Sequence, residues 1–382
     1  MIGSRTDRRE LMTDILSLFA DRDDPVLSVD RAIAECRGGR PVLLTGGGSL
    51  LVLPVETLAP EDLAAIEPLA AGRARLVLGA PRLERLGATE RRPGSLAFPV
   101  LDAARIERLA IARDARLDAS VAPLTDADSA GLELIRLASL LPAFVAIPLD
   151  PAQPAGRLAR VSAADIRAYR GREAADIHIV TRAPMPLEDA PDSEIVVFRG
   201  GEGLRDHAAI IVGRPDLSQP VVVRMHSACL TGDVFGSLKC DCGDQLRSTA
   251  RYMAEHGGGV ILYLDQEGRG NGLSNKIRAY RLQADGFDTY DADEILGFGR
   301  DQRGFDFAAR MLTALGVKSV RLMTNNPLKI AALEAAGVEL VSSERILGRL
   351  TRENVGYLAA KRDRAGHRID ATLVAPPVRT AE

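Results

Sequence analysis

The 382-residue sequence has no tryptophan, few aromatic residues (4%) and only four cysteines. It also has no run of about 20 apolar residues, the length that a membrane-spanning helix needs. Its first residues contain no apolar core long enough for a signal peptide. Because disulfide-built secreted domains are rich in cysteine, this usage favours a reducing compartment. We therefore expect a cytoplasmic protein that does not bind a membrane.

An excess of positive charge is absent as well. The formal net charge is −3, so neither DNA nor RNA is an expected partner. Hydrophobic residues make up 46% and charged residues 26%, which is ordinary for a soluble globular protein. A chain of this length is sufficient for two domains, each with its own core. No histidine precedes His178 and no lysine precedes Lys239.

Three of the four cysteines lie together in the second half. Cys229, Cys240 and Cys242 have the spacing Cys-x10-Cys-x-Cys. Thiolates bind zinc well, and three protein ligands leave the fourth position for a water molecule that can ionise near neutral pH. The spacing therefore suggests a hydrolytic zinc site. It is equally compatible with three reduced thiols that bind nothing. His226 is a candidate fourth ligand or simply a hydrogen-bonding side chain.

The first half alternates helix and strand patterns, which indicates an α/β or α+β domain. We expect a helix and a strand within 29–44, a helix from Pro60, a strand at 75–78, a helix at 129–141 and a strand after it. The glycine run 46–48 is more typical of a turn than of a phosphate site. Cys36 fits a packing position. We identify no active site in this half.

Several segments of the first half resemble 3,4-dihydroxy-2-butanone 4-phosphate synthase, namely AIAECRGGRPVLL, TLAPEDL, LERLGA, SLAFPVLDA and LELIRLASLLPA. That family carries an acidic cluster after its first strand, where this chain has 45–49 (TGGGS). It also has a His-Thr-Glu segment where this chain has 127–129 (ADS). The acids serve magnesium binding and proton transfer. The resemblance thus implies an inactive domain, retained as a scaffold or interaction surface.

Residues 163–190 mix charge, proline and glycine and suggest a connection between domains. The second half then alternates strands and helices, with polar residues where these elements end. Glu267, Gly268 and Arg269 follow a strand, Asp301 and Arg303 precede a helix, and Lys329 follows TNNP in a first helical turn. Glycine backbone and cations at such ends suit a phosphate. The residues alone predict zinc-assisted hydrolysis of a phosphorylated small molecule.

Residues 181–369 closely resemble GTP cyclohydrolase II, because HS-x-CLTGD, SLKCDCG, QEGRG, NKIRAY, LTALGV and TNNP follow in that family's order. The resemblance implies hydrolysis of GTP to a diaminopyrimidine monophosphate, formate and diphosphate in riboflavin biosynthesis. It also implies one zinc per subunit, magnesium on the triphosphate and a homodimer. The zinc ligands would be Cys229, Cys240 and Cys242, with a zinc-activated water attacking C8 of the guanine.

The same resemblance assigns further roles. Asp301 would accept a proton, Tyr280 would assist ring opening, and Arg303 would attack the α-phosphate. A guanidinium is a poor nucleophile, so an electrostatic role for Arg303 stays open. The residues expected to hold GTP are Arg224, Met225, His226, Ser227, Ala228, Gln245, Glu267, Gly268, Arg269, Thr289, Thr324 and Lys329.

Three residues depart from the family pattern. Ala228 stands where glutamate is common, Asp265 where arginine is common, and Asn271 where an aliphatic residue is common. These departures allow a relative with another substrate or product, such as an enzyme of pyrimidine breakdown or one that retains the formyl group. A non-catalytic zinc or nucleotide-binding protein is a third hypothesis. We expect an α/β (α+β) two-domain chain, with an inactive domain over 1–180 and a catalytic domain over 181–375.

Overall fold

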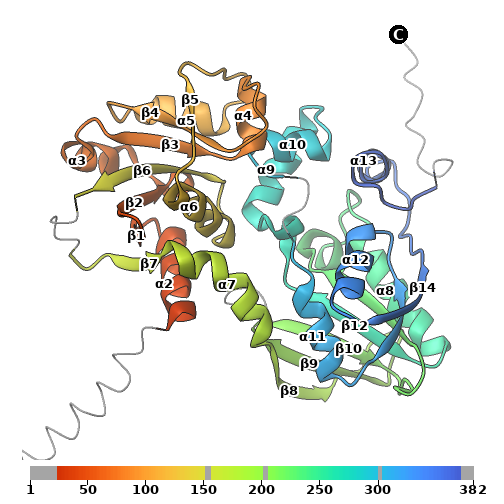
Figure 1. The fold of residues 1–382 in the computed structure, drawn as a ribbon. Helices are drawn as coiled ribbons and strands as arrows, with labels where there is room; N and C mark the ends of the chain where they lie inside the picture. The colour runs from red at the N-terminus through yellow and green to blue at the C-terminus, as the bar shows by residue number, and fades with distance from the viewer. Residues whose placement is uncertain (1–23, 151–155, 201–204, 300–302, 371–382) are drawn as a thin grey trace, which may run out of the picture.

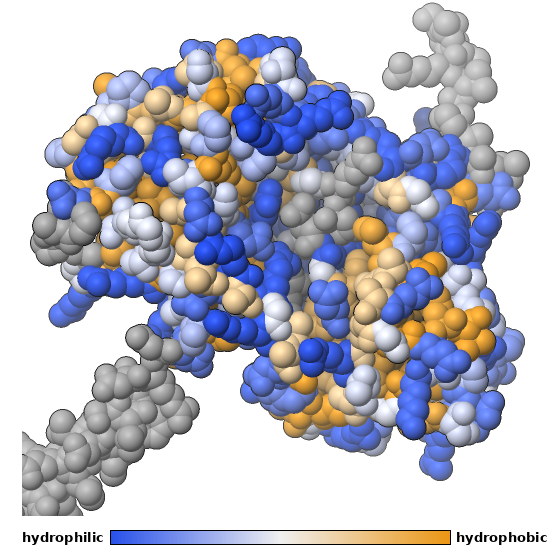
Figure 2. Space-filling view, viewed as in Figure 1, coloured by the Kyte–Doolittle hydropathy of each residue, from blue (hydrophilic) through white to orange (hydrophobic). Residues whose placement is uncertain are grey.

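The computed structural model describes residues 24–150, 156–200, 205–299 and 303–370 and contains two seven-stranded sheets (Figure 1). Sheet A has the strand order β5-β4-β3-β6-β2-β1-β7, and sheet B has the order β14-β13-β11-β12-β10-β9-β8. Helices pack against both sheets, so the predicted mixed α/β fold class is confirmed. Figure 2 shows the two halves as separate lobes with a hollow between them on the face in view.

Sheet A and its helices occupy the first part of the chain. The strands are β1 (Val42–Thr45), β2 (Ser49–Pro54), β3 (Ala74–Leu78), β4 (Gly94–Phe98), β5 (Val121–Pro123), β6 (Ala143–Leu149) and β7 (Ala159–Ser162). The helices are α2 (Pro25–Arg37), α3 (Pro60–Ala70), α4 (Ala80–Leu86), α5 (Ala103–Ile111), α6 (Asp126–Leu137) and α7 (Ala163–Ala175). Cores lie on both faces of the sheet. One contains α2, α6 and α7, and the other contains α3, α4 and α5.

Local capping explains where α6 begins. The Thr125 hydroxyl accepts a hydrogen bond from the Asp128 backbone N–H at 3.1 Å, and Asp128 accepts one from the Thr125 N–H at 3.0 Å. This reciprocal pair satisfies two amides at the helix start. The helix therefore begins three residues before the predicted position and ends at Leu137.

The glycine run is a turn, as predicted. It joins the antiparallel strands β1 and β2. Gly46, Gly47 and Gly48 have φ values of 117°, 73° and 142°, which side-chain-bearing residues rarely adopt. The glycines are therefore explained by backbone conformation.

Sheet B contains β8 (His178–Pro184), β9 (Ser193–Arg199), β10 (His207–Val212), β11 (Val221–Ser227), β12 (Gly259–Leu264), β13 (Ser319–Met323) and β14 (Glu339–Glu344). Its helices are α8 (Cys242–Glu255), α9 (Leu273–Ala284), α10 (Thr289–Ile295), α11 (Asp306–Ala314), α12 (Pro327–Ala335) and α13 (Val355–Ala365). The sequence patterns predict strands at 194–200, 208–213, 221–225, 259–266, 319–323 and 338–341, and helices at 244–256, 274–285, 305–315 and 328–336. These predictions match every element of sheet B and its helices except β8, α10 and α13.

The predicted connection over 163–190 is wrong in its detail, because it contains α7 and the edge strand β8. Ser162 caps α7 by accepting a hydrogen bond from the Asp165 N–H at 3.0 Å. Strand β8 is largely exposed and pairs only with β9. An exposed edge strand carries no apolar pattern, so the sequence resembled a linker. The expected boundary at residue 180 falls inside β8.

Two features of the fold position the site. Strand β11 runs parallel to both β12 and β13, so the carboxyl ends of these three strands meet at one edge of sheet B. Ligands bind at such edges in α/β sheets. Helices α9 and α10 lie between the two lobes (Figure 1), where α10 contacts α4. No helix in the described ranges is both long and apolar enough to cross a membrane.

Candidate active site

A cavity of about 460 Å³ opens at the carboxyl edge of β11, β12 and β13. Most of the residues predicted for the site line it: Arg224, His226, Ser227, Ala228, Cys229, Cys240, Cys242, Gln245, Glu267, Gly268, Arg269, Tyr280, Thr289, Arg303, Thr324 and Lys329. Met225 lies behind the wall, and its carbonyl accepts a hydrogen bond from the Lys329 ammonium. Asp301 falls outside the described residues.

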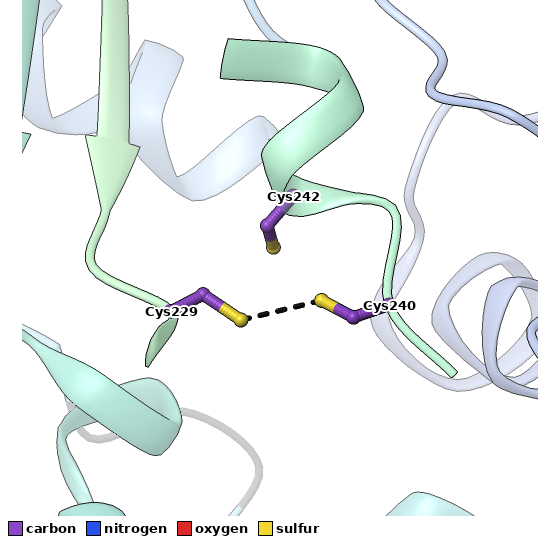
Figure 3. Close-up of side chains that lie close together, drawn as sticks. All are labelled: Cys229, Cys240 and Cys242. Atoms are coloured by element: carbon purple, nitrogen blue, oxygen red, sulfur yellow. Dashed lines mark hydrogen bonds between the residues drawn. The ribbon is translucent and has the colours of Figure 1, made fainter. Parts of the chain in front are cut away.

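The three cysteines converge on one wall of this cavity. Cys229 follows β11, Cys240 lies in the next loop, and Cys242 is the first residue of α8. Their Sγ atoms all lie within 4.8 Å of one another, with Cys229 and Cys240 at 3.2 Å, and the three side chains point toward a common centre (Figure 3). Tetrahedral zinc holds sulfurs about 3.8 Å apart. The donor set and spacing therefore fit a zinc ion.

Gly232 leaves room for this cluster. A Cβ on Gly232 would lie 2.8 Å from Cys240 Sγ and 3.1 Å from Cys229 Sγ. Real Cβ contacts are longer, so any side chain would displace the thiols. The requirement for glycine in the CLTGD segment thus comes from the sulfur cluster rather than from an unusual φ.

Lys276, which was not among the predicted site residues, places a positive charge beside the thiols. Lys276 Nζ lies 3.0 Å from Cys229 Sγ and 2.8 Å from Glu267 Oε1. Hydrogen bonds from the other two thiols, together with the Lys276 ammonium, hold the pKa of Cys229 well below its usual range. The hydrogen bond to Cys229 in turn raises the pKa of Cys240 to about 12. The Lys276 ammonium therefore favours the thiolate form of Cys229.

His226 is a hydrogen-bonding residue and not part of the cysteine cluster. Its Nε2 lies 3.1 Å from both carboxylate oxygens of Asp233. Asp233 also accepts hydrogen bonds from the Cys229 N–H and the Tyr263 hydroxyl, each at 3.0 Å. Burial lowers the pKa of His226. The Asp233 carboxylate thus fixes the backbone at Cys229.

A second hydrogen-bond network connects strand β11 with the segment 240–242, which contains two of the cysteines and is called the metal loop below. The buried Arg224 guanidinium donates to Gln245 Oε1, and the Gln245 amide donates to Asp241. Asp241 stands between Cys240 and Cys242 and is 1% exposed. Lys361 of α13 lies 3.6 Å from its other carboxylate oxygen. The network connects a predicted substrate residue, Arg224, with two residues that the sequence did not single out.

The glycine-rich loop after β12 holds the Arg269 guanidinium in a fixed position. Gly268 and Arg269 both have φ near 62°, and Arg269 is one of three non-glycine residues with positive φ in the described ranges. Its guanidinium donates to Asp293 of α10 and lies 4.8 Å from the centre of the Tyr290 ring. A strained backbone with a paired cation marks a functional position.

The predicted catalytic side chains face the same cavity. Arg303 Nη1 donates to the Ser227 hydroxyl at 3.2 Å. The Tyr280 hydroxyl lies 3.3 Å from the Thr231 hydroxyl, and burial raises the pKa of this tyrosine. Both groups are thus oriented by residues at the end of β11 or just after it.

Several lining residues have no counterpart in the sequence prediction: Lys239, Asp241, Lys276, Tyr290, Asp293, Tyr357, Lys361 and Arg364. Lys276 stands four residues before Tyr280 and therefore on the same helical face, a signal that was available in NKIRAY. The residues of α13 lie far away in sequence and could be found only from the structure.

The three departures from the family pattern differ in position. Ala228 and Asn271 line the cavity, whereas Asp265 does not. The backbone of Asp265 is held by Arg205 and His207, at 3.0 and 3.1 Å. The replacement of a common arginine by Asp265 therefore does not change the charge of the residues that line the cavity. Asn271 is 4% exposed, and its Oδ1 has no hydrogen-bond partner among the described residues.

Buried polar atoms without partners gather in this cavity. Within the described ranges they include Arg224 Nε, His226 Nδ1, Asp241 Oδ1 and Asn271 Oδ1, each on a lining residue. Buried polar atoms are nearly always hydrogen-bonded in folded proteins, to protein, water or ligand. Their concentration here indicates a site built for a polar ligand.

Comparisons with known proteins agree with this location. A family model described as GTP cyclohydrolase II matches residues 178–345. A GTP cyclohydrolase-2 of Xylella fastidiosa strain Temecula1 is 42% identical over 346 residues, covering 89% of this chain and 87% of that protein. A GTP cyclohydrolase-2 of Vibrio vulnificus is 51% identical over 179 residues, covering 47% of this chain but 90% of that protein.

Among solved structures, a two-domain 3,4-dihydroxy-2-butanone 4-phosphate synthase from A. baumannii is 20% identical to this chain. It covers 83% of this chain and 98% of its own, with a TM-score of 0.31. The Xylella relative covers enough of this chain to include parts of both halves. At 42% identity over nearly the whole length, the comparison establishes that this chain belongs to the GTP cyclohydrolase II family.

Proposed function

We propose that this protein hydrolyses GTP to 2,5-diamino-6-(5-phosphoribosylamino)pyrimidin-4-one, formate and diphosphate, the first reaction of riboflavin biosynthesis. The observation that carries the proposal is the three-thiol cluster on the wall of a polar cavity at the carboxyl edge of β11–β13. Family membership supports the identity of the substrate.

Zinc would be held by Cys229, Cys240 and Cys242, one ion per chain, and would supply Lewis-acid activation of a water molecule. Lys276 offsets the negative charge of the thiolates and holds Glu267 beside them. Asp233 keeps the Cys229 loop in place through the Cys229 N–H. Burial alone would lower the pKa of Lys276, but Cys229 and Glu267 hold it above its usual value. The lysine therefore remains cationic.

The cations of the cavity suit a triphosphate with magnesium. Lys329 lies in the first turn of α12, where the helix dipole attracts an anion. We assign nucleotide binding to the predicted lining residues, with Met225 acting through its backbone. Arg303 and Tyr280 are the proposed catalytic side chains. Asp301 keeps its proposed role as proton acceptor, although it lies outside the described residues.

The proposal also assigns a role to each of the two domains. Residues 1–180 would form an inactive synthase-like domain, and 181–375 the catalytic domain. The first half has no acidic cluster at 45–49, where β1 and β2 are joined by glycines. We further propose a cytoplasmic homodimer that binds neither nucleic acid nor membrane, as the charge and composition suggest.

A second candidate is a relative with another product, such as one that retains the formyl group. It is favoured by Asn271, whose buried Oδ1 lacks a partner on the cavity wall at a position where the family commonly has an aliphatic residue. An added amide there could hold a polar substituent that the usual product lacks. Product mass separates the two candidates.

The test is incubation of the zinc-loaded full chain with GTP and magnesium, with products read by mass spectrometry and a formate assay. We expect the diaminopyrimidine monophosphate, formate and diphosphate in equal amounts. Cys229→Ser and Cys242→Ser should lose zinc and activity together. A formyl-retaining product would favour the second candidate, and unchanged GTP with full zinc occupancy would overturn the proposal.

A further inference from the structure

Helix α13 forms one wall of the cavity and is tied to it at both ends. Before the helix, the Thr351 hydroxyl donates to the Leu238 carbonyl at 2.6 Å, next to the metal loop. Gly348 passes so close that a Cβ there would lie 2.6 Å from the Asp241 carbonyl oxygen. After the helix, the Arg368 N–H donates to the Asn325 carbonyl at 3.0 Å.

A single arginine anchors the same helix to α10 on the far side. The Arg364 guanidinium donates to Asp288, Asp291 and Glu294 at 2.9–3.0 Å. The helix therefore spans the cavity from the metal loop to α10, in a defined orientation. This placement makes its inward side chains part of the site rather than a loose cover.

Two side chains of α13 face the metal end of the cavity. Lys361 Nζ lies 4.0 Å from the centre of the Tyr357 ring and 3.6 Å from Asp241 Oδ1. The second distance is too long for a hydrogen bond, and Asp241 Oδ1 has no such partner within the described ranges. The Lys361 side chain is 16% exposed. Its ammonium is thus near a carboxylate, and the residue lines the cavity.

The chemistry of the substrate decides whether Lys361 or Asp241 can form a hydrogen bond with it. If C8 of guanine faces the three thiols, the neighbouring groups are N7 and O6 on one side and the ribose and α-phosphate on the other. These base and phosphate atoms accept hydrogen bonds. A lysine can donate to them, whereas the Asp241 carboxylate would repel them.

Two other cations of the cavity wall are held by acidic partners. Lys276 is held by Glu267 and Cys229, and Arg269 by Asp293. We propose that Lys361 is a substrate-binding residue, which donates a hydrogen bond to the guanine nucleotide at the metal end of the cavity, with Tyr357 positioning its ammonium. The inference rests on the proposed function and extends the site to α13.

Kinetics of zinc-loaded full-length variants test this inference. Lys361→Met should raise the KM for GTP about tenfold or more, as expected for loss of a charge-assisted hydrogen bond, while zinc content stays at the wild-type level. Lys361→Arg, which retains the charge, should recover part of the affinity. Lys318→Met is the matched control, because Lys318 is exposed, and should leave KM unchanged.

Inhibition by GMP locates the contact. If the KI of GMP and the KM of GTP rise equally, the result supports a contact of Lys361 with the base or the α-phosphate. If only the KM of GTP rises, Lys361 contacts the outer phosphates instead, away from the metal end. An unchanged KM in Lys361→Met and Lys361→Arg would overturn the inference. The inference would also be overturned if both variants lost zinc while the fraction that still holds zinc kept the wild-type KM. Lys361 would then act only on the metal site. Wild-type turnover, measured first, reports separately on the proposed function.

Discussion

Gly232 is the residue on which the geometry of the three thiols depends most directly. Its missing side chain leaves the space that Cys229 and Cys240 occupy. We expect Gly232→Ala to lower zinc occupancy and turnover together, because the new methyl group would push Cys240 Sγ away from the common centre.

Zinc content and GTP turnover measured on the same preparation check this expectation. Gly171→Ala is the control, since a Cβ on Gly171 in α7 meets no other atom within 4 Å. Full zinc occupancy and wild-type turnover in Gly232→Ala would mean that the loop relaxes without cost.

His207 is a buried residue whose protonation should set the acid sensitivity of sheet B. Its ring stacks on Phe307 at 4.4 Å between centroids, and its Nδ1 accepts the Asp265 N–H at 3.1 Å. Burial lowers the pKa of His207 from 6.5 to about 4. The folded state therefore binds fewer protons than the unfolded state between these values.

The free energy of unfolding should consequently fall as pH decreases from about 6.5 to about 4, by about 3 kcal/mol at most from this residue. Urea denaturation at a series of pH values measures the slope. His207→Asn, which keeps an acceptor near Nδ1, should flatten it, whereas His178→Asn at an exposed position should not. An equally steep slope in His207→Asn would assign the acid sensitivity to other groups.

At the scale of elements, the start of α13 depends on one buried amide. Asn354 is 0% exposed, and its Oδ1 accepts the Thr351 N–H at 3.0 Å while its Nδ2 donates to the Arg349 carbonyl at 2.9 Å. We expect Asn354→Ala to destabilise α13 by about 1–2 kcal/mol, because two buried backbone groups lose their partner.

Hydrogen exchange resolved by peptide is the suitable measurement. Amides of α13 should exchange roughly tenfold faster in Asn354→Ala, with those of β11 and β12 unchanged. Glu353→Ala, at the exposed neighbouring position, serves as control. Faster exchange throughout sheet B would show instead that Asn354 supports the whole domain.

At the scale of the whole molecule, the two lobes are joined by a buried contact. Arg82 is 2% exposed and donates to the carbonyls of Arg108, Leu109, Ala112 and Ile295, at 2.8–3.1 Å. Burial lowers its pKa to about 10, so it is charged at neutral pH. Around it, Leu141 of the first lobe packs with Ala279, Ala292, Leu296 and Phe298 of the second.

This contact links the first lobe to α9 and α10, which carry Tyr280, Thr289 and Asp293 of the cavity. Leu141 of the first lobe packs on Ala279 of α9 and Ala292 of α10. The first lobe therefore supports the helices that carry these cavity side chains.

Removal of the Arg82 side chain tests the coupling of the lobes. Arg82→Met should lower the free energy of unfolding by about 3 kcal/mol, because four carbonyls lose a charged donor. We expect one transition in urea for the wild-type chain and two for Arg82→Met, since the lobes of the variant no longer stabilise each other. Calorimetry and urea titration check both effects, with the exposed Arg91→Met as control. One cooperative transition at wild-type stability would exclude this role.

The sequence by itself determined that three thiols of the second half lie close together. They fall within 14 residues and are brought together by one loop and one helix start, so local spacing was sufficient to predict the cluster, while zinc binding and hydrolysis of GTP were implied by the family resemblance. Strands and long helices were also predictable, since their apolar periodicity is written in consecutive residues. Short α10 and exposed β8 were missed because they have too little of that periodicity.

Only the tertiary structure decided what completes the cavity. Lys361 and Asp241 are 120 positions apart in the sequence, and they meet because the chain after β14 passes back over the metal loop. Asp265 is adjacent to the QEGRG motif, yet it does not line the cavity. Likewise, the support that Arg82 gives to α10 spans 213 positions. Such contacts depend on how packed elements are placed, and no local pattern in the sequence encodes that placement.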